Sequence, residues 1–343
     1  MEWELYKESY EKEAQNHNLS DETIKSNLKY AYNLYKQNVP IIYDQLHFSL
    51  LVGISYEYIL KVTNAPKQSY RRFSIAKKNG DKRIIHEPLP TLKIIQEWIL
   101  HEILNNIDVS PYAKAYRKKV SLKDNVKFHR NQKKVLRLDI KDFFGSIKQN
   151  QVLSIFLKIG YTIDVSTLLA KICTLSGKLP QGSPTSAALS NLVMRGFDKE
   201  ISLYCNEKKI RYTRYADDMT FSGDFKEQKL IKKVKSYLSW IRLELNLDKT
   251  NLMRKHNRQL VTGITVNEKI QVNVQKRRKL RQEVYFIRKY GLCSHLRHRG
   301  FAEYDSDMYL KSLIGKIGYC LFINPKDEEF REYLKFLKSE LSK

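Results

Sequence analysis

The sequence predicts an α+β fold in which helices pack on one face of a small antiparallel sheet. Three observations lead to this prediction. The central part of the chain reads as strand, two helices, long helix, strand–turn–strand, helix and strand, an order typical of that arrangement. Helical periodicity dominates the segments before and after it. With 343 residues and 42% hydrophobic content, the chain can build a sizeable core and two or three subdomains.

The first part of the chain predicts helices followed by a hairpin. In residues 1–63, apolar positions such as Ile24, Leu28 and Ala31 recur at helical spacing. A second helical set runs through Leu46, Leu50, Leu51 and Ile54. Residues 71–76 and 82–86 read as two strands, and Asn79-Gly80 between them is a hairpin turn signal. Residues 94–107 read as an apolar helix.

The central and C-terminal parts alternate strands and helices. We expect strands at 134–140, 210–215, 219–222 and within 251–267. We expect helices at 149–159, 165–176, 183–207, 225–245, 275–290, 306–322 and 326–342. Ser183 would cap the long third helix of the central part, with Pro184 as its first helical residue.

The charge of the chain points to a polyanionic partner. Lys and Arg number 62 against 37 Asp and Glu, which leaves a net charge of +25. Residues 114–134 and 276–299 concentrate this charge and interleave it with aromatic residues, a pattern that suits phosphate neutralisation and base stacking. A solubilising surface or an anionic membrane would be alternatives. We favour nucleic acid.

Other features predict a soluble cytoplasmic protein. No apolar run is long enough to span a bilayer, and the N-terminal residues lack the order of a signal peptide. Cys173, Cys205, Cys293 and Cys320 lie far apart without zinc spacing, so we expect free thiols in a reducing compartment.

Three acids form the candidate catalytic group. Asp139 ends the apolar strand VLRLDI, and Asp217 and Asp218 lie in the turn of the hairpin RYTRYADDMTFSG. Crowded carboxylates raise one another's pKa, and a bound cation removes that cost. Such a set could hold two Mg²⁺ ions about 3.5–4 Å apart, the arrangement used in phosphoryl transfer. For any single Asp, the alternative is a surface turn residue or a helix cap.

These acids lie in motifs that resemble those of reverse transcriptases. Tyr215-Ala216-Asp217-Asp218 looks like the YxDD signature, and LRLDIKDFFGSI resembles the first acidic motif. LPQGSPTS resembles the glutamine-glycine motif, RRFSIAKKNGDKRIIHEP the fingers hairpin and LNLDKT the motif that supplies a lysine. The resemblance implies an RNA-directed DNA polymerase with a right-hand polymerase fold. Its parts would be an N-terminal helical extension (1–63), fingers and an antiparallel-sheet palm (64–265) and a helical, RNA-binding thumb (266–343).

The resemblance assigns roles to individual residues. The metal ligands would be Asp139, Asp217, Asp218 and the carbonyl of Ile140, and Lys249 would protonate the leaving pyrophosphate. The residues at the incoming dNTP would be Lys77, Arg83, Phe144, Gln181 and Gly182. In that set Lys77 and Arg83 grip the triphosphate, and Phe144 excludes a 2′-OH. The alternatives are hairpin surface charge, core packing, a helix entry and a solvated lysine.

Further residues resemble the bacterial retron type of the family. Val261-Thr262-Gly263 resembles the retron VTG, and Asn125 to His129 resembles its NAxxH element, with Val126 in place of Ala. Asn125 and His129 would share one helix face, either as RNA-binding residues or as plain helix surface. The RNA-gripping thumb helix would carry Lys276, Arg277, Arg278, Lys279 and Arg281.

The retron resemblance implies a set of partners. These are a structured non-coding RNA that serves as template and 2′-OH primer, the single-stranded DNA copied from it, dNTPs, and an effector protein that completes an anti-phage system. Another bacterial reverse transcriptase, of group II intron-like, diversity-generating or other defence type, is the nearest alternative. A catalytically silent RNA-binding protein is the alternative from another class, and the three acids argue against it.

Overall fold

The computed structural model describes residues 2–76, 80–300 and 305–342. Two compact units can be distinguished. The first comprises Met1–Tyr116, Ile140–Leu203 and Ile231–Asn246, and the second comprises Arg117–Asp139, Tyr204–Leu230 and Leu247–Lys343. Both units are therefore assembled from segments that lie far apart in the sequence.

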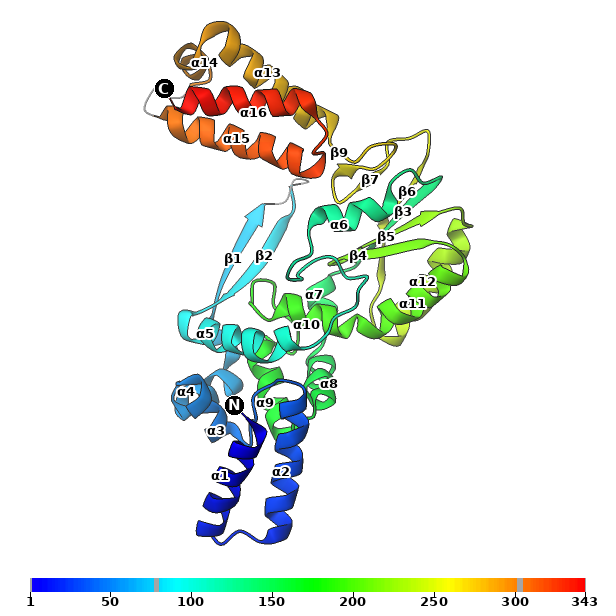
Figure 1. Cartoon of the computed structure of the whole chain (residues 1–343). Helices are drawn as coiled ribbons and strands as arrows, with labels where there is room; N and C mark the ends of the chain where they lie inside the picture. The colour runs from blue at the N-terminus through cyan, green and yellow to red at the C-terminus, as the bar shows by residue number, and fades with distance from the viewer. Residues whose placement is uncertain (1, 77–79, 301–304, 343) are drawn as a thin grey trace. The chain divides into compact units, whose positions relative to one another are not determined.

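The first unit begins with four helices, where the sequence predicts helical structure in two sets. They are α1 (Trp3–Asn16), α2 (Asp21–Lys36), α3 (Gln45–Val52) and α4 (Tyr56–Asn64). The helices α1 and α2 form an antiparallel pair, drawn in dark blue in Figure 1, and bury Ala14, Ile24 and Leu28 between them. The second predicted helical set forms as α3, which ends before Ile54. Leu46, Leu50 and Leu51 are exposed, and the helix buries Phe48 and Ser49 instead.

A two-stranded hairpin follows these helices, as predicted. A short 3₁₀ turn (Pro66–Ser69) leads into β1 (Tyr70–Ala76), which pairs with β2 (Lys82–Pro88). Asn79 of the predicted turn lies outside the described residues. The next helix starts earlier than predicted, as α5 (Pro90–Trp98), and continues as a π-helical turn (Ile99–Ile103) and a 3₁₀ turn (Leu104–Asn106).

Helices α7 (Phe143–Ser146), α8 (Gln149–Ile159), α9 (Ile163–Cys173) and α10 (Ser186–Val193) complete most of the first unit. The bounds of α8 are those that the sequence predicts. The long helix predicted over 183–207 is wrong, because it divides at Met194 into α10 and α11 (Arg195–Glu207). Ser183 does not cap it. The Ser183 hydroxyl donates to Oε1 of the buried Gln96 at 2.8 Å, and the helix begins only at Ser186.

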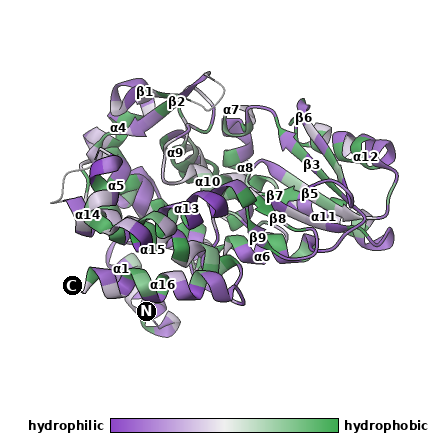
Figure 2. Ribbon diagram, turned by 90° about the horizontal axis from the view of Figure 1, so that it is seen from above, coloured by the Kyte–Doolittle hydropathy of each residue, from purple (hydrophilic) through white to green (hydrophobic). Residues whose placement is uncertain are grey.

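The main sheet has the strand order β4-β5-β3-β6. Its strands are β3 (Lys134–Ile140), β4 (Arg211–Tyr215), β5 (Asp218–Gly223) and β6 (Leu245–Arg254). Strand β5 pairs antiparallel with both β3 and β4. The amphipathic helix predicted at 225–245 is shorter, as α12 (Glu227–Trp240), and Figure 2 shows hydrophilic and hydrophobic residues alternating along it. The predicted α+β class with an antiparallel sheet is confirmed.

The second unit ends in four helices, of which the sequence predicts three. Helices α13 (Val274–Tyr290), α15 (Ser306–Ile323) and α16 (Glu328–Leu341) match the predictions, and α14 (Leu292–His298) was not predicted. A small sheet of β7 (Leu260–Val261), β8 (Ile264–Thr265) and β9 (Gln271–Val272) precedes them. One core cluster joins Val126, Val261, Val284 and Phe330, so this small sheet and the last helices fold against each other.

Two further expectations can be compared with the structure. The four cysteines are free thiols, and Cys293 is the exposed one among them. Within residues 2–76, 80–300 and 305–342, no helix has the length and apolar character needed to cross a bilayer.

Candidate active site

Strand pairing brings the candidate acids to one end of the main sheet. Asp139 on β3 lies opposite Asp218 on β5, and Tyr215 on β4 pairs with the same Asp218. Ala216 and Asp217 form the two-residue turn between β4 and β5. Ala216 has φ +58°, a left-handed conformation that costs about 1–3 kcal/mol for a residue with a Cβ. The strain of this turn suggests that its geometry is needed for function.

A buried arginine supports the turn. Arg214 is fully buried, and its Nη1 donates to the carbonyl oxygen of Ala216 at 3.1 Å. The hydrogen bond from the guanidinium offsets part of the backbone strain at Ala216. It also holds the turn, and so the backbone of Asp217, in one conformation. Arg214 was not predicted as a site residue, because an arginine within a strand gives no local sign of its partner.

The acids are electrostatically destabilised by their surroundings. Burial raises the pKa of Asp217, and the neighbouring carboxylates of Asp139 and Asp218 raise it further. Burial also raises the pKa of Asp218, an effect that the Arg137 guanidinium opposes. A bound cation would therefore relieve repulsion that the fold itself maintains.

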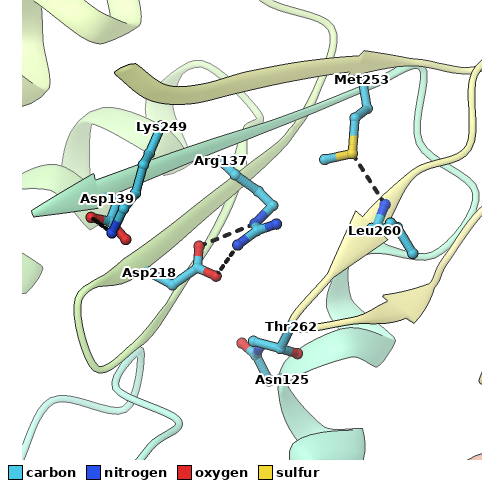
Figure 3. A network of polar contacts seen from close by, with 8 residues as sticks. All are labelled: Asn125, Arg137, Asp139, Asp218, Lys249, Met253, Leu260 and Thr262. Carbon is cyan, nitrogen blue, oxygen red and sulfur yellow. Dashed lines mark hydrogen bonds and ion pairs between the residues drawn. The ribbon is translucent and has the colours of Figure 1, made fainter. Parts of the chain in front are cut away.

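Two cationic side chains lie on these acids (Figure 3). Arg137 donates to both carboxylate oxygens of Asp218, from Nε at 3.3 Å and from Nη2 at 2.5 Å. Lys249 Nζ lies 2.8 Å from Asp139 Oδ1, so the structure brings this predicted residue into the acidic group. Arg137 was not predicted as a site residue, although its position two residues before Asp139 places both on one face of β3.

The three candidate acids are of the residue type that binds divalent metals, and two of them are also paired with a cationic side chain. All three side chains are carboxylates, the ligands that Mg²⁺ prefers, and Ile140 ends the strand that carries Asp139. In the part of the chain that the structure describes, no three His, Cys, Asp or Glu side chains already converge as a metal site. Lys249 lies on one oxygen of Asp139 and Arg137 lies on both oxygens of Asp218, and each carboxylate keeps lone pairs that could also bind a metal.

The predicted dNTP residues lie in the first unit, apart from Lys77, which falls outside the described residues. The β2 strand contacts the glutamine-glycine turn directly, because the His86 amide donates to the Gln181 carbonyl at 2.8 Å. Gly182 has φ +127°, and a Cβ there would come within 2.7 Å of the His86 oxygen, so only glycine fits. Arg83 is exposed on β2, and Phe144 is half-buried against Phe143.

The predicted surface pair Asn125 and His129 is buried, which corrects the prediction. Both side chains are 0% exposed. His129 Nδ1 lies 2.7 Å from Ser222 Oγ, and its Nε2 lies 2.8 Å from Thr213 Oγ1. Thr213 in turn donates to Asn125 Oδ1 at 2.6 Å. These side chains therefore tie the segment before β3 to strands β4 and β5, and they have no exposed surface.

Asn125 also connects the two retron-like elements. Its Nδ2 donates to Thr262 Oγ1 at 3.4 Å, as Figure 3 shows. Thr262 and Gly263 form the two-residue turn between β7 and β8, and both have positive φ, +46° and +81°. A β-branched residue rarely adopts this conformation. Val261 is buried, so Thr262 and Gly263 are the residues of this element whose turn reaches the surface.

Two of the arginines predicted to bind RNA in the thumb form ion pairs with acids of the same chain. Arg277 is mostly buried and pairs with Asp327 at 2.5 Å, and Arg281 pairs with Glu329 at 2.6 Å. These pairs fasten α13 to the start of α16. Lys276, Arg278 and Lys279 are exposed on α13. RNA binding by α13 thus stays a prediction for these three residues. Arg277 and Arg281 instead stabilise the packing of α13 against α16.

The buried His129 leads to a prediction about acid stability. Burial, with Arg211 nearby, lowers the pKa of His129 from 6.5 to about 3. A lowered folded-state pKa contributes stability that is present above pH 6.5 and is lost as the pH falls toward 3. Between pH 6.5 and 5 we expect a loss of about 1–2 kcal/mol in the free energy of unfolding.

His129→Gln isolates this contribution. Urea unfolding should show a variant that is less stable than wild type at pH 7 by about 1–3 kcal/mol, because buried hydrogen bonds are lost. The variant should lose less stability than wild type between pH 7 and pH 5. Equal losses in the two proteins would mean that His129 is not the titrating group.

Comparison with known proteins now identifies the family. Residues 75–279 match the family "Reverse transcriptase (RNA-dependent DNA polymerase)". The Escherichia coli retron Ec86 reverse transcriptase is 30% identical over 290 residues, covering 82% of this chain and 90% of that protein. The chain belongs to the reverse transcriptases of the bacterial retron type.

Further comparisons extend this finding. The Escherichia coli retron Ec83 reverse transcriptase is 30% identical over 287 residues, covering 77% of this chain and 91% of that protein. A solved telomerase from Candida albicans aligns with a TM-score of 0.48 at 11% identity, over 84% of this chain and 66% of that one. The family match and the retron relatives show an RNA-directed DNA polymerase with the right-hand fold of its family, whose members generally use divalent metal ions.

The contact between Arg137 and Asp218 predicts a positioning role. Arg137→Lys keeps the charge and loses the two-pronged contact, and we expect the single-turnover rate of nucleotide incorporation to fall about 10- to 100-fold. Arg137→Met should be slower still. The dNTP concentration for half-maximal rate should change little, since Arg137 holds an acid and not the nucleotide. A lysine variant with the wild-type rate would contradict this role.

Proposed function

We propose that this enzyme copies part of a cognate structured non-coding RNA into single-stranded DNA in the cytoplasm, priming from a 2′-OH of that RNA. The observation that carries the proposal is the similarity to retron reverse transcriptases over about nine-tenths of their length. The strained Thr262–Gly263 turn, held by Asn125, supports it as an RNA contact specific to this branch. An effector protein would complete an anti-phage system.

The chemistry of the proposal is nucleotidyl transfer. The attacking hydroxyl oxygen forms a bond to the α-phosphorus of the dNTP, and the bond from that phosphorus to the pyrophosphate oxygen breaks. Asp139, Asp217 and Asp218, with the Ile140 carbonyl, would hold two Mg²⁺ ions. These supply charge stabilisation at the attacking and leaving oxygens.

The remaining residues bind and orient the substrates. Lys77 and Arg83 would hold the triphosphate, Gln181 and Gly182 would contact the nucleotide and template, and Phe144 would exclude a ribose. Lys249, whose ammonium lies 2.8 Å from Asp139, would donate the proton that the leaving pyrophosphate takes up. The exposed Lys276, Arg278 and Lys279 would grip RNA phosphates.

The test is to express the chain with its flanking DNA and to extract nucleic acid from the purified protein. Digestion with RNase A and DNase, before and after a debranching enzyme, should reveal a short discrete DNA joined to RNA. That product should be missing from Asp217→Asn and present in Asp164→Asn, an exposed acid on α9. RNA without DNA, together with activity on an added primer–template, would keep the polymerase and reject retron-type priming. Phage plating on cells with both variants tests the defence role.

A further inference from the structure

The first unit contains a large hollow away from the residues assigned to catalysis. It has a volume of about 1060 Å³ and lies among α8, the α10–α11 junction, the turn after α12 and residues 107–112. Helices α8 and α10 pack against each other beside it. None of its lining residues is an aspartate of the candidate active site or a predicted dNTP residue. This volume lies at the upper end of the ~300–1,000 Å³ usual for small-molecule sites and is large enough for a segment of a polymer.

Cationic side chains dominate this hollow. Lys158 on α8, Arg195 and Lys199 on α11, and Arg242 after α12 line it, and all four are exposed. Arg195 and Lys199 are four residues apart and therefore share one face of α11. Across the described ranges, none of the four takes part in an ion pair, and Asp108 is the single acid in the lining. Four cationic side chains therefore share the lining with one carboxylate.

An exposed tryptophan completes the lining. The Trp240 side chain is 65% exposed, although burial of such a ring would be favourable. Its ring lies 4.6 Å from that of Tyr237, which is buried and braces one side. The hollow therefore combines an exposed aromatic ring with four cations. Proteins that bind single-stranded nucleic acid use the same combination, in which the ring stacks on a base and the cations neutralise phosphates.

The segment that carries Trp240 is held in place. Gln151 Nε2 on α8 donates to the Ile241 carbonyl at 2.9 Å. Arg242 has φ +54°, and the Leu243 amide donates to the Leu238 carbonyl at 3.0 Å, which closes α12 tightly. Because the turn is tied to α8, Trp240 and Arg242 keep their positions relative to Lys158.

We propose that this hollow, here named the α8–α12 groove, binds a segment of single-stranded nucleic acid. Lys158, Arg195, Lys199 and Arg242 neutralise successive phosphates, and a base stacks on Trp240. An acidic polypeptide would satisfy the cations but would leave the Trp240 ring without a stacking partner. The site is distinct from the catalytic acids and does not depend on how synthesis is primed.

Tryptophan fluorescence tests the proposal directly, since stacking of a base quenches the ring. The chain has three tryptophans, and the other two pack within the protein, Trp3 at 4.8 Å from Tyr32 and Trp98 at 5.6 Å from Phe48. The full-length enzyme is titrated with twelve-residue oligo-U and oligo-dT, about the length covered by one single-strand binding module, without dNTPs. We expect salt-sensitive quenching by one or both strands, and its loss in Trp240→Phe.

The charge contribution is measured separately. In Arg195→Gln/Lys199→Gln, the slope of log affinity against log salt should fall by about 1.4, the value for two phosphate contacts on a single strand. Lys171→Gln/Lys232→Gln, exposed lysines of the same unit, is the matched control and should keep the wild-type slope. Trp240→Ala should weaken binding about 10-fold.

Several outcomes would overturn the proposal. One is quenching that survives in Trp240→Phe, and another is an equal change of slope in the two double variants. Equal quenching by duplex RNA would exclude base stacking, and equal quenching by poly-glutamate would assign the groove to an acidic protein. Since no catalysis is measured, these results stay separate from the outcome for the proposed function.

Discussion

Replacing Asp217 with asparagine should lower the rate of nucleotide incorporation by at least about 10³-fold. The change preserves the shape of the side chain and removes one anionic ligand from the acidic group. Metal ions in such sites contribute several kcal/mol to the transition state, and each 1.4 kcal/mol is a factor of ten in rate. Single-turnover extension of a primer–template with Mg²⁺ measures the effect.

The same variant should not be less stable than wild type without metal. Burial and the neighbouring acids raise the pKa of Asp217, which means that its charge is unfavourable in the fold. Mg²⁺ should raise the melting temperature of wild type more than that of Asp217→Asn, because ligand binding stabilises only the form that binds it.

Asp164→Asn serves as the control here too, and it should match wild type in rate and in melting temperature. An Asp217→Asn enzyme that retains a tenth of the wild-type rate would refute a metal-binding role for this residue. Loss of activity accompanied by a large fall in melting temperature would indicate a folding defect instead.

The parts of the fold with a regular period could be predicted from the sequence. Strand β3 and helix α8 match their predicted bounds because their apolar residues alternate or recur without interruption. The division at Met194 was not predicted, although Gly196 two residues later is a poor helix former. The Ser183 side chain was misassigned because its partner, Gln96, lies on another helix.

In the candidate site, the acids could be predicted from the sequence, whereas the contacts between side chains of different strands could not. Asp139, Asp217 and Asp218 follow from their positions at strand ends. Arg137 could be connected with Asp218 only once the strand register was known.

Four of the predicted RNA-binding residues, Asn125, His129, Arg277 and Arg281, are buried or paired within the protein for a related reason. Asn125 and His129 have the spacing of a helix face, yet that face is buried against β4 and β5. Arg277 is cationic in a basic run, but its partner Asp327 lies fifty residues further along the chain. Periodicity reports which residues share a face, and only the tertiary structure reports what covers it.

Replacing Phe144 with alanine should let the enzyme accept ribonucleotides. The two phenylalanines of α7 have different surroundings, since Phe143 is 5% exposed in the core and Phe144 is half-buried. Phe144 therefore has a free side on which a sugar can rest. A ring there excludes a 2′-OH by its volume, and we expect the preference for dNTPs over NTPs to fall about 10²-fold in Phe144→Ala.

The comparison that decides this role is kcat/KM for dGTP and for GTP in matched variants. Phe144→Tyr retains the ring and should retain the preference, whereas Phe143→Leu should lower the melting temperature and leave the preference unchanged. The gain in Phe144→Ala should come from faster GTP incorporation, because removing volume relieves a clash that only the ribose makes. If the alanine variant loses dGTP and GTP activity in equal proportion, Phe144 supports the fold of α7 and does not select the sugar.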